Sequence, residues 1–139
     1  MYQKVIIAGN LGGDPEMRYM PDGTAVTNFS VATNRRWTDA SGEQKEETVW
    51  FRVSVWRRQA EVANEYLSKG RQVLVEGRLR ADPATGGPRT WTGQDGTVRA
   101  SYELTADTVR FIGGRDAVSF GAEGDGEGQA PQEEDEIPF

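Results

Sequence analysis

The segment from Thr48 to Trp56, TVWFRVSVW, carries large side chains at alternating positions. This period of two predicts a strand whose successive side chains point to opposite faces. One face then carries Val49, Phe51, Val53 and Val55, and the other carries Trp50, Arg52, Ser54 and Trp56. Indole rings offer flat stacking surfaces, and a guanidinium binds phosphate and stacks on planar rings. The second face therefore predicts a site for a flat, anionic ligand, unless it packs against another sheet or subunit.

The remaining two tryptophans lie in basic, polar surroundings. Trp37 follows Asn34-Arg35-Arg36, and Trp91 follows Arg89-Thr90. Either loop could fold back and bury its indole locally, but all four tryptophans of the chain coincide with a candidate ligand face or a basic loop. The candidate binding residues are Trp37, Trp50, Arg52, Trp56, Arg58, Lys69, Arg80 and Trp91.

Stacking on aromatic side chains along a basic groove requires unpaired bases, because the bases of a duplex already stack on each other. The pattern therefore predicts sequence-independent binding of a single-stranded nucleic acid. No residue pattern reads the 2′-hydroxyl that distinguishes RNA from DNA. An RNA-binding or oligosaccharide-binding module remains the alternative, although the arginines suit a neutral sugar less well.

Enzyme chemistry has few residues to use in this chain. It contains neither histidine nor cysteine, which removes the usual general base, the thiolate nucleophile and the commonest zinc ligands. A hydrolase using paired carboxylates lacks a convergent acid pair. We therefore expect no catalysis, no metal and no cofactor.

The net charge of −6 is unevenly distributed along the chain. All 16 Lys and Arg lie between Lys4 and Arg115 together with 14 acids, which gives that stretch a charge of +2. Residues 116–139 carry the other 8 acids and no base, a charge of −8. This asymmetry indicates a mildly basic domain with an acidic interaction tail.

The order of expected elements indicates the fold class. Strands are predicted at 5–8, 25–33, 48–56, 72–80 and 97–112, with a helix at 58–68 that Gly70 caps. Turns are expected at Pro21-Asp22-Gly23 and Gln94-Asp95-Gly96, and exposed loops at 34–46 and 82–88. This order favours an all-β domain with one helix, a five-stranded Greek-key barrel of the OB type, over residues 1–112.

After residue 112 the composition is too polar to fold. We expect a flexible linker over 113–131 and an acidic tip over 132–139. In the tip, Glu134, Asp135 and Glu136 precede Ile137, Pro138 and Phe139. An apolar end behind acids is typical of a docking peptide, although many acidic tails only solubilise. Without a signal peptide or an apolar run of about 18 residues, the expected location is cytoplasmic.

Several segments together resemble the bacterial single-stranded DNA-binding protein family. They are GNLGGDPEMRYMPDGTAV at 9–26, TVWFRV at 48–53, AEVANEYLSKG at 60–70, VEGRLR at 75–80 and EEDEIPF at the end. The resemblance covers residues 1–112 and the last seven. Phe51 stands where the best-known members have histidine, Trp56 stands where phenylalanine is usual, and 81–88 resembles an insertion.

The resemblance implies a homotetrameric OB-fold protein around which single-stranded DNA wraps. Its stacking aromatics correspond to Trp37, Trp50, Trp56 and Trp91, and its partner-binding tip to residues 134–139. The implied function is protection of single-stranded DNA in replication, recombination and repair, with recruitment of replication and repair proteins through the tip. The implied location is the cytoplasm, associated with the nucleoid.

Overall fold

The computed structural model describes residues 1–113 and the backbone of Ser119 and Phe120. Most of the expected linker and the whole tip, with Glu134, Asp135, Glu136, Ile137, Pro138 and Phe139, lie outside the described residues. The elements are β1 Val5–Leu11, β2 Glu16–Tyr19, β3 Ala25–Thr38, β4 Gln44–Trp56, α1 Arg58–Tyr66, β5 Gln72–Leu79, β6 Thr90–Thr92, β7 Val98–Ala100, β8 Tyr102–Ile112 and β9 Ser119–Phe120.

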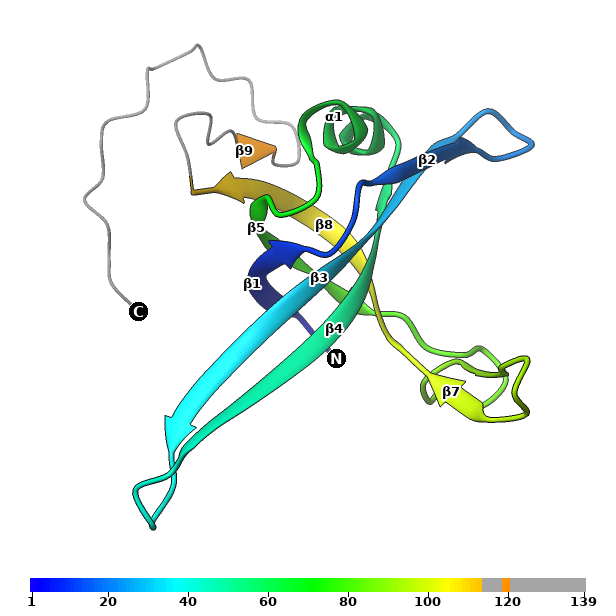
Figure 1. The fold of residues 1–139 in the computed structure, drawn as a ribbon. Coiled ribbons are helices and arrows are strands. Elements are labelled where there is room, and N and C mark those ends of the chain that lie inside the picture. Colours follow the sequence, from blue (N-terminus) through cyan, green and yellow to red (C-terminus); the bar gives the residue numbers. More distant parts are fainter. Residues whose placement is uncertain (114–118, 121–139) are drawn as a thin grey trace.

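Five of these strands form a closed, mixed barrel (Figure 1). Hydrogen bonding runs from β1 to β5, β8, β4 and β3, and β3 pairs with β1 again. Only β4 and β8 run parallel, with Phe51 opposite Tyr102. The expected fold class, an OB-type barrel with one helix, is confirmed. No described helix has the length and apolar character that crossing a membrane would need.

The barrel interior is filled by alternate side chains of each strand. Val53 and Val55 of β4 are fully buried, as are Val73 and Val75 of β5 and Leu104 of β8. Residues two apart on a strand point to the same face, so each strand contributes one face to a single core. Burying this apolar surface is the main force that stabilises the fold.

Two glycines allow neighbouring strands of the barrel to approach closely. A Cβ on Gly9 of β1 would overlap the carbonyl of Ala32 on β3, and one on Gly77 of β5 would overlap that of Thr105 on β8. The register between β5 and β8 also shifts at Gly77, as expected for a bulge that bends a strand at a barrel corner.

Helix α1 covers one end of the barrel (Figure 1). The buried Thr27 hydroxyl donates to the Ala60 carbonyl over 2.6 Å, which fixes the helix to β3. The expected helix extended to residue 68, but α1 ends at Tyr66 because Leu67 is extended. The expected cap at Gly70 is therefore wrong. Gly70 instead lies in the turn after the helix, where it has φ 87° and its N–H donates to the carbonyl of Leu11 in β1.

The segment 34–46 is exposed as expected, but it is a loop only at 39–43, and the rest of it belongs to strands. Strands β3 and β4 remain paired from Val26–Trp56 out to Thr38–Gln44, and form a long ribbon beyond the barrel (Figure 1). Both faces of the ribbon meet solvent, so its sequence is polar although its backbone is extended. Cross-strand hydrogen bonds, rather than burial, hold this segment.

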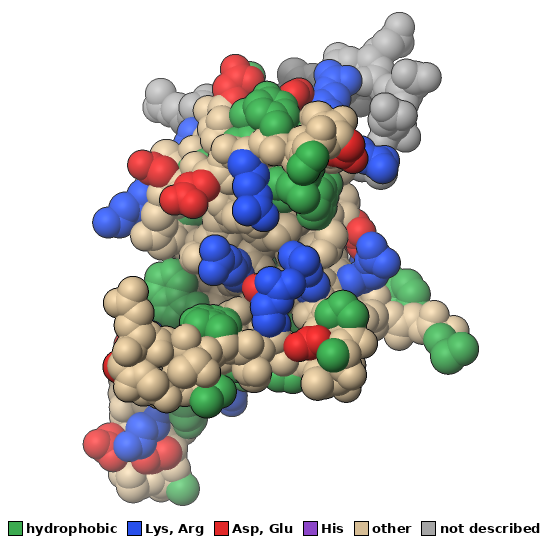
Figure 2. Space-filling view, turned by 90° about the vertical axis from the view of Figure 1, so that its right-hand side faces the viewer, with side chains coloured by type: hydrophobic (Ala, Val, Ile, Leu, Met, Phe, Trp, Pro, Cys, Tyr) green, Lys and Arg blue, Asp and Glu red, His purple; other side chains and the backbone are tan. Residues whose placement is uncertain are grey.

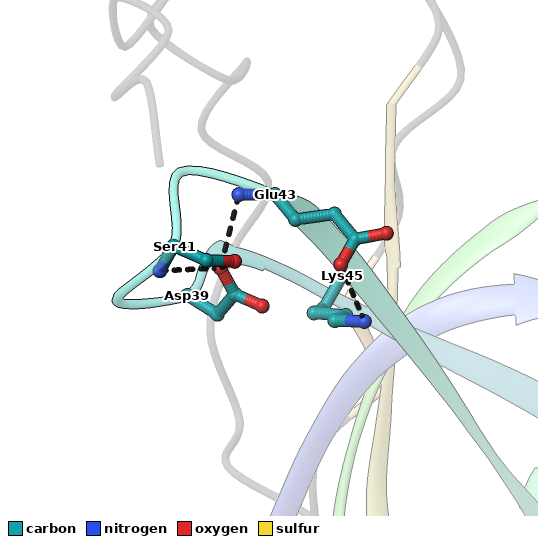
Figure 3. A network of polar contacts seen from close by, with 4 residues as sticks. All are labelled: Asp39, Ser41, Glu43 and Lys45. Atoms are coloured by element: carbon teal, nitrogen blue, oxygen red, sulfur yellow. Dashed lines mark hydrogen bonds and ion pairs between the residues drawn. The ribbon is translucent and has the colours of Figure 1, made fainter.

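The turn at the ribbon tip is built around Asp39 (Figure 3). Its carboxylate accepts hydrogen bonds from the Ser41 hydroxyl at 2.6 Å and from the N–H groups of Ser41 and Glu43 at 2.9 Å. These hydrogen bonds, first that of the Ser41 hydroxyl, lower the pKa of the Asp39 carboxyl. Lys45 pairs with Glu43 at 3.1 Å beside them. Local polar contacts therefore define this turn.

Two further hairpins border the barrel. The short β2 was not predicted; it pairs with β3, and the expected turn at 21–23 joins them with Gly23 at φ 87°. The expected turn at 94–96 is confirmed. It joins β6 to β7, and Gly96 there has φ 80°.

Candidate nucleic-acid interface

The two faces of β4 differ as the alternation predicts. Val53 and Val55 face the core and are fully buried. On the other face Trp50 is 53% exposed, Arg52 is exposed and Trp56 is half-buried. Ser54 is the buried member of this face and donates to the Asn28 side chain over 2.7 Å. The outer face therefore presents two indoles on either side of a guanidinium.

Trp50 and Arg52 line a first hollow of about 380 Å³. The rest of its lining comes from the segment after β1, from the start of β2 and from β3, namely Gly12, Gly13, Asp14, Glu16, Asn28, Phe29 and Ser30. A Cβ on Gly12 would overlap the outer edge of the Trp50 ring, and the Gly12 N–H donates to the Ser30 carbonyl at 3.0 Å. The glycine backbone thus forms a wall against which the indole rests.

A second hollow of about 600 Å³ adjoins the first and shares Arg52, Asn28 and Glu16 with it. It also gathers residues that are distant in the sequence, namely Met17, Arg18, Ser54, Arg80, Arg89, Trp91 and Glu103. Its four arginines exceed its two glutamates, which gives this hollow a net charge of +2. Trp91 is 42% exposed here. An anion with a planar ring fits both features.

Glu103 lies within this basic hollow. Its side chain is only 13% exposed, and its Oε2 lies 3.9 Å from Nε of Arg89. That oxygen is buried and accepts no hydrogen bond from any described residue. Its neighbour across the parallel pair is Arg52, and its backbone carbonyl accepts the Arg80 N–H at 2.8 Å. A carboxylate therefore stands among the guanidiniums.

A third hollow of about 710 Å³ lies at the other end of the outer face of β4. It is lined by Met20, Pro21, Asp22, Thr24, Trp56, Arg57, Arg78, Thr105, Ala106 and Asp107. Along β4 the order is Trp50 in the first hollow, Arg52 in the first and second, and Trp56 in the third. We call this succession the β4 row.

The space-filling view agrees with a basic surface. Figure 2 shows Lys and Arg side chains gathered across the middle of one face, with hydrophobic side chains beside them. Acidic side chains are fewer in that central patch. A basic track with adjoining apolar surface is the arrangement that tracks a nucleic-acid backbone and stacks its bases.

Trp37 lies apart from the three hollows, on the ribbon rather than in a loop. It pairs with Lys45 across the ribbon and is 38% exposed. The guanidinium of Arg35 lies 4.8 Å from the centre of its ring. One face of this indole therefore already has a cation partner, and the arrangement is an exposed aromatic–arginine pair of the kind that stacks on bases.

The structure does not bring all eight predicted residues together. Arg58 begins α1 and Lys69 follows it; both are exposed, and neither lines one of the three hollows. Lys69 touches the rim of the first hollow only through its backbone N–H, which donates to Asp14 at 2.9 Å. Sequence reasoning left Gly12, Arg18 and Glu103 out of the site, because only the pairing of distant strands places them there. It named Arg57 and Arg78 as possible extensions of the basic track, and both line the third hollow.

Three comparisons identify proteins that are similar to this chain. The sequence pattern of the single-strand binding protein family matches residues 2–112. Single-stranded DNA-binding proteins of Neisseria meningitidis serogroups A and B are both 44% identical over 119 residues, which is 86% of this chain and 64% of theirs. The chain therefore spans less than two thirds of the length of these relatives.

A solved structure shares the fold. The Plasmodium falciparum SSB complex with ssDNA superposes with a TM-score of 0.66 and 28% identity. The match covers 81% of this chain and 97% of the other. The barrel thus has the OB fold, and the outer face of β4 carries a row of hollows lined by indoles and guanidiniums. The chain belongs to the single-strand binding protein family, whose members bind DNA and are not enzymes.

Proposed function

We propose that this protein binds single-stranded DNA, without regard to sequence, along the β4 row. The observation that carries the proposal is the alternation of indole and guanidinium over three hollows that follow one another along β4. Stacking tolerates any base, and arginines neutralise the backbone phosphates. Trp37 and Trp91 extend the stacking surface from the ribbon and from β6. Coating exposed strands in this way protects them during replication, recombination and repair.

The comparisons support DNA over the alternatives. The relatives from Neisseria are described as single-stranded DNA-binding proteins, and the Plasmodium structure is a complex with ssDNA. An oligosaccharide would use the indoles but would leave the net positive charge of the second hollow unbalanced.

A competition titration tests this function. Tryptophan emission is followed as oligo-dT, oligo-U or a neutral oligosaccharide is added to the full-length chain. We expect strong quenching and the tightest binding with oligo-dT. Because affinity depends steeply on salt, each titration is repeated at several salt concentrations. Equal binding of the oligosaccharide, or tighter binding of oligo-U, would contradict the proposal.

We also propose a homotetramer with two-fold interfaces. Ile6 on the outer face of β1 is 60% exposed, and Tyr102 on β8 is 59% exposed beside Phe51, with ring centres 5.8 Å apart. This is more exposed apolar surface than the β4 row requires. Light scattering at micromolar concentration should report about four times the chain mass of 15.3 kDa. A monomer would contradict the assembly without affecting the binding site.

The acidic tip has a separate proposed role, the recruitment of replication and repair proteins. Phe139 and Ile137 would fill an apolar pocket of a partner while the preceding acids meet its basic groups. Removing Phe139 should leave oligo-dT binding nearly intact and abolish capture of such proteins from an extract. Unchanged capture would identify the tip as a solubilising end.

The tail as a whole should compete weakly with DNA, because residues 116–139 carry −8 beside a domain of +2. A tethered segment has an effective concentration in the millimolar range. Deleting 116–139 should raise affinity for oligo-dT most at low salt, where the Debye length is about 30 Å, and only slightly at 0.15 M, where it is about 8 Å. A loss of affinity would place the tail within the DNA site.

A further inference from the structure

We infer that Arg57 is a phosphate-binding residue which extends the DNA path from Trp56 into the third hollow, and that the chain keeps it there against backbone strain. The inference rests on the proposed function and adds a residue to it. Arg57 follows the last stacking residue of β4 directly and precedes α1. Its side chain is exposed and lines the third hollow together with Trp56 and Arg78.

The backbone of Arg57 has φ 64° and ψ −135°. Among the described residues it is the sole non-glycine with positive φ. A side chain in this region is strained, and glycine is the residue that adopts it without cost. The main chain holds this conformation from both sides, because the Arg57 N–H donates to the Ala25 carbonyl at 2.8 Å and its carbonyl accepts from Ala60 at 3.0 Å. A glycine would suit this position better, so the guanidinium itself requires an explanation.

The charges around the hollow supply that explanation. Its acids are Asp22 and Asp107, and its cations are Arg57 and Arg78. Arg78 lies 3.9 Å from Asp107. Asp22 accepts the Thr24 N–H at 3.0 Å, and hydrogen bonds from Thr24 hold the pKa of its carboxyl below the usual value, with a smaller contribution from the charge of Arg57.

Within the described residues, Arg57 has no ion pair within 4.0 Å. It is the cation of this hollow that lies free for a phosphate. Without it the hollow would carry a net charge of −1 and would repel a DNA backbone.

The position of the hollow makes it an extension of the path and not an isolated site. Arg80 lies in the second hollow, and Arg78, two residues earlier on β5, lies in the third. On β8, Glu103 lines the second hollow and Thr105, two residues later, lines the third. A DNA strand with a base stacked on Trp56 therefore has its next phosphates over the third hollow. Arg57 is the cation available to bind them there.

Three substitutions separate the charge from the strain. Arg57→Gly removes both, Arg57→Ala removes the charge and keeps the strain, and Arg57→Lys keeps both. Each full-length variant is titrated with oligo-dT at several salt concentrations, and its Tm is measured without DNA. Arg110→Ala is the control, because it removes the same charge from an exposed residue of β8 that lines none of the three hollows.

We expect Arg57→Gly and Arg57→Ala to weaken oligo-dT binding about tenfold. The slope of the logarithm of the binding constant against the logarithm of the salt concentration should become shallower by about 0.7, the value for one phosphate contact on a single strand. Arg57→Lys and Arg110→Ala should bind nearly as the wild type does. The Tm of Arg57→Gly should rise by about 2–5 °C, since the strain is relieved, while Arg57→Ala should melt near the wild type.

The outcomes separate this inference from the proposed function. If the wild type does not bind oligo-dT, the proposed function is wrong and the inference falls with it. If the wild type binds oligo-dT, and Arg57→Gly and Arg57→Ala both bind it as tightly as the wild type does, only the role of Arg57 is wrong. A lower Tm for Arg57→Gly would contradict the claim that the chain keeps the arginine against strain.

Discussion

The two faces of β4 place apolar side chains in opposite environments. On the inner face Val53 and Val55 are fully buried, whereas on the outer face the larger Trp50 is 53% exposed. Both faces lie on one backbone, with the same partner β3. Local strand propensity therefore cannot account for the difference.

The inner face is explained by folding alone, since apolar burial stabilises the barrel. The outer face is not, because an exposed indole leaves apolar surface in water without a gain in stability. Exposed aromatic rings beside arginines are explained by a ligand that stacks and carries negative charge. The difference between the faces thus separates the residues that stabilise the fold from the residues that we propose to bind DNA.

The largest expected effect is on the inner face. Val53→Ala removes two methyl groups from a site without solvent exposure, so we expect it to reduce the free energy of unfolding by about 2–3 kcal/mol. Urea unfolding at a fixed protein concentration measures this loss. Val98→Ala, at a valine that is 68% exposed on β7, is the control and should change stability by less than about 0.5 kcal/mol. The folded Val53→Ala protein should bind oligo-dT normally, and a loss of affinity would show that the faces are not independent.

Trp50→Ala should produce the opposite result. We expect oligo-dT binding to weaken by about 1–3 kcal/mol, with the unfolding free energy within about 0.5–1 kcal/mol of the wild type. Tyr19→Ala is the matched control, because this aromatic residue is 61% exposed and lines none of the three hollows. Normal affinity in a folded Trp50→Ala, Trp56→Ala double variant would contradict the assignment of the outer face.

The same contrast explains how much the sequence could predict. The alternation in β4 predicted both of its faces, because period two is a local property and one face is apolar. The ribbon was missed because neither of its faces is buried, so residues such as Arg35 and Glu47 carry no apolar alternation although they pair in register.

The hollows could be predicted only in part. Trp50, Arg52 and Trp56 lie on one strand, and their proximity follows from strand geometry. Arg80 was named from the sequence, but Arg18 and Glu103 join the second hollow through pairings of distant strands, which no local pattern reveals. The conformation of Arg57 was also beyond the sequence, since a positive φ normally predicts glycine and not arginine.

A smaller effect is expected from a substitution that shifts the Trp50 ring of the outer face without removing it. Gly12→Ala would place a methyl group against the Trp50 ring and turn the indole away from its rotamer, at a cost of about 0.5–1.5 kcal/mol. We expect oligo-dT affinity to fall by a similar amount and the tryptophan emission to shift.

Gly13→Ala is the control for this change, since a Cβ there meets no atom within 4 Å. The two glycines are adjacent and both line the first hollow, but only a Cβ at Gly12 would meet the Trp50 ring. Equal affinities in the two variants would show that the Gly12 backbone does not position the indole.

The smallest effect concerns the carboxylate in the second hollow. Glu103 lies at the limit of an ion pair with Arg89, and its Oε2 accepts no hydrogen bond from a described residue. A group held so weakly cannot fix a guanidinium firmly, but its charge opposes any phosphate that the arginines attract. Glu103→Gln keeps the shape and removes that charge, so oligo-dT affinity should rise about two- to fivefold at low salt and approach the wild type as salt screens the field. Glu65→Gln, which removes the same charge from the exposed face of α1, should have little effect. A fall in affinity for Glu103→Gln would mean that the carboxylate positions the arginines, and the second hollow would then depend on its acid as well as on its bases.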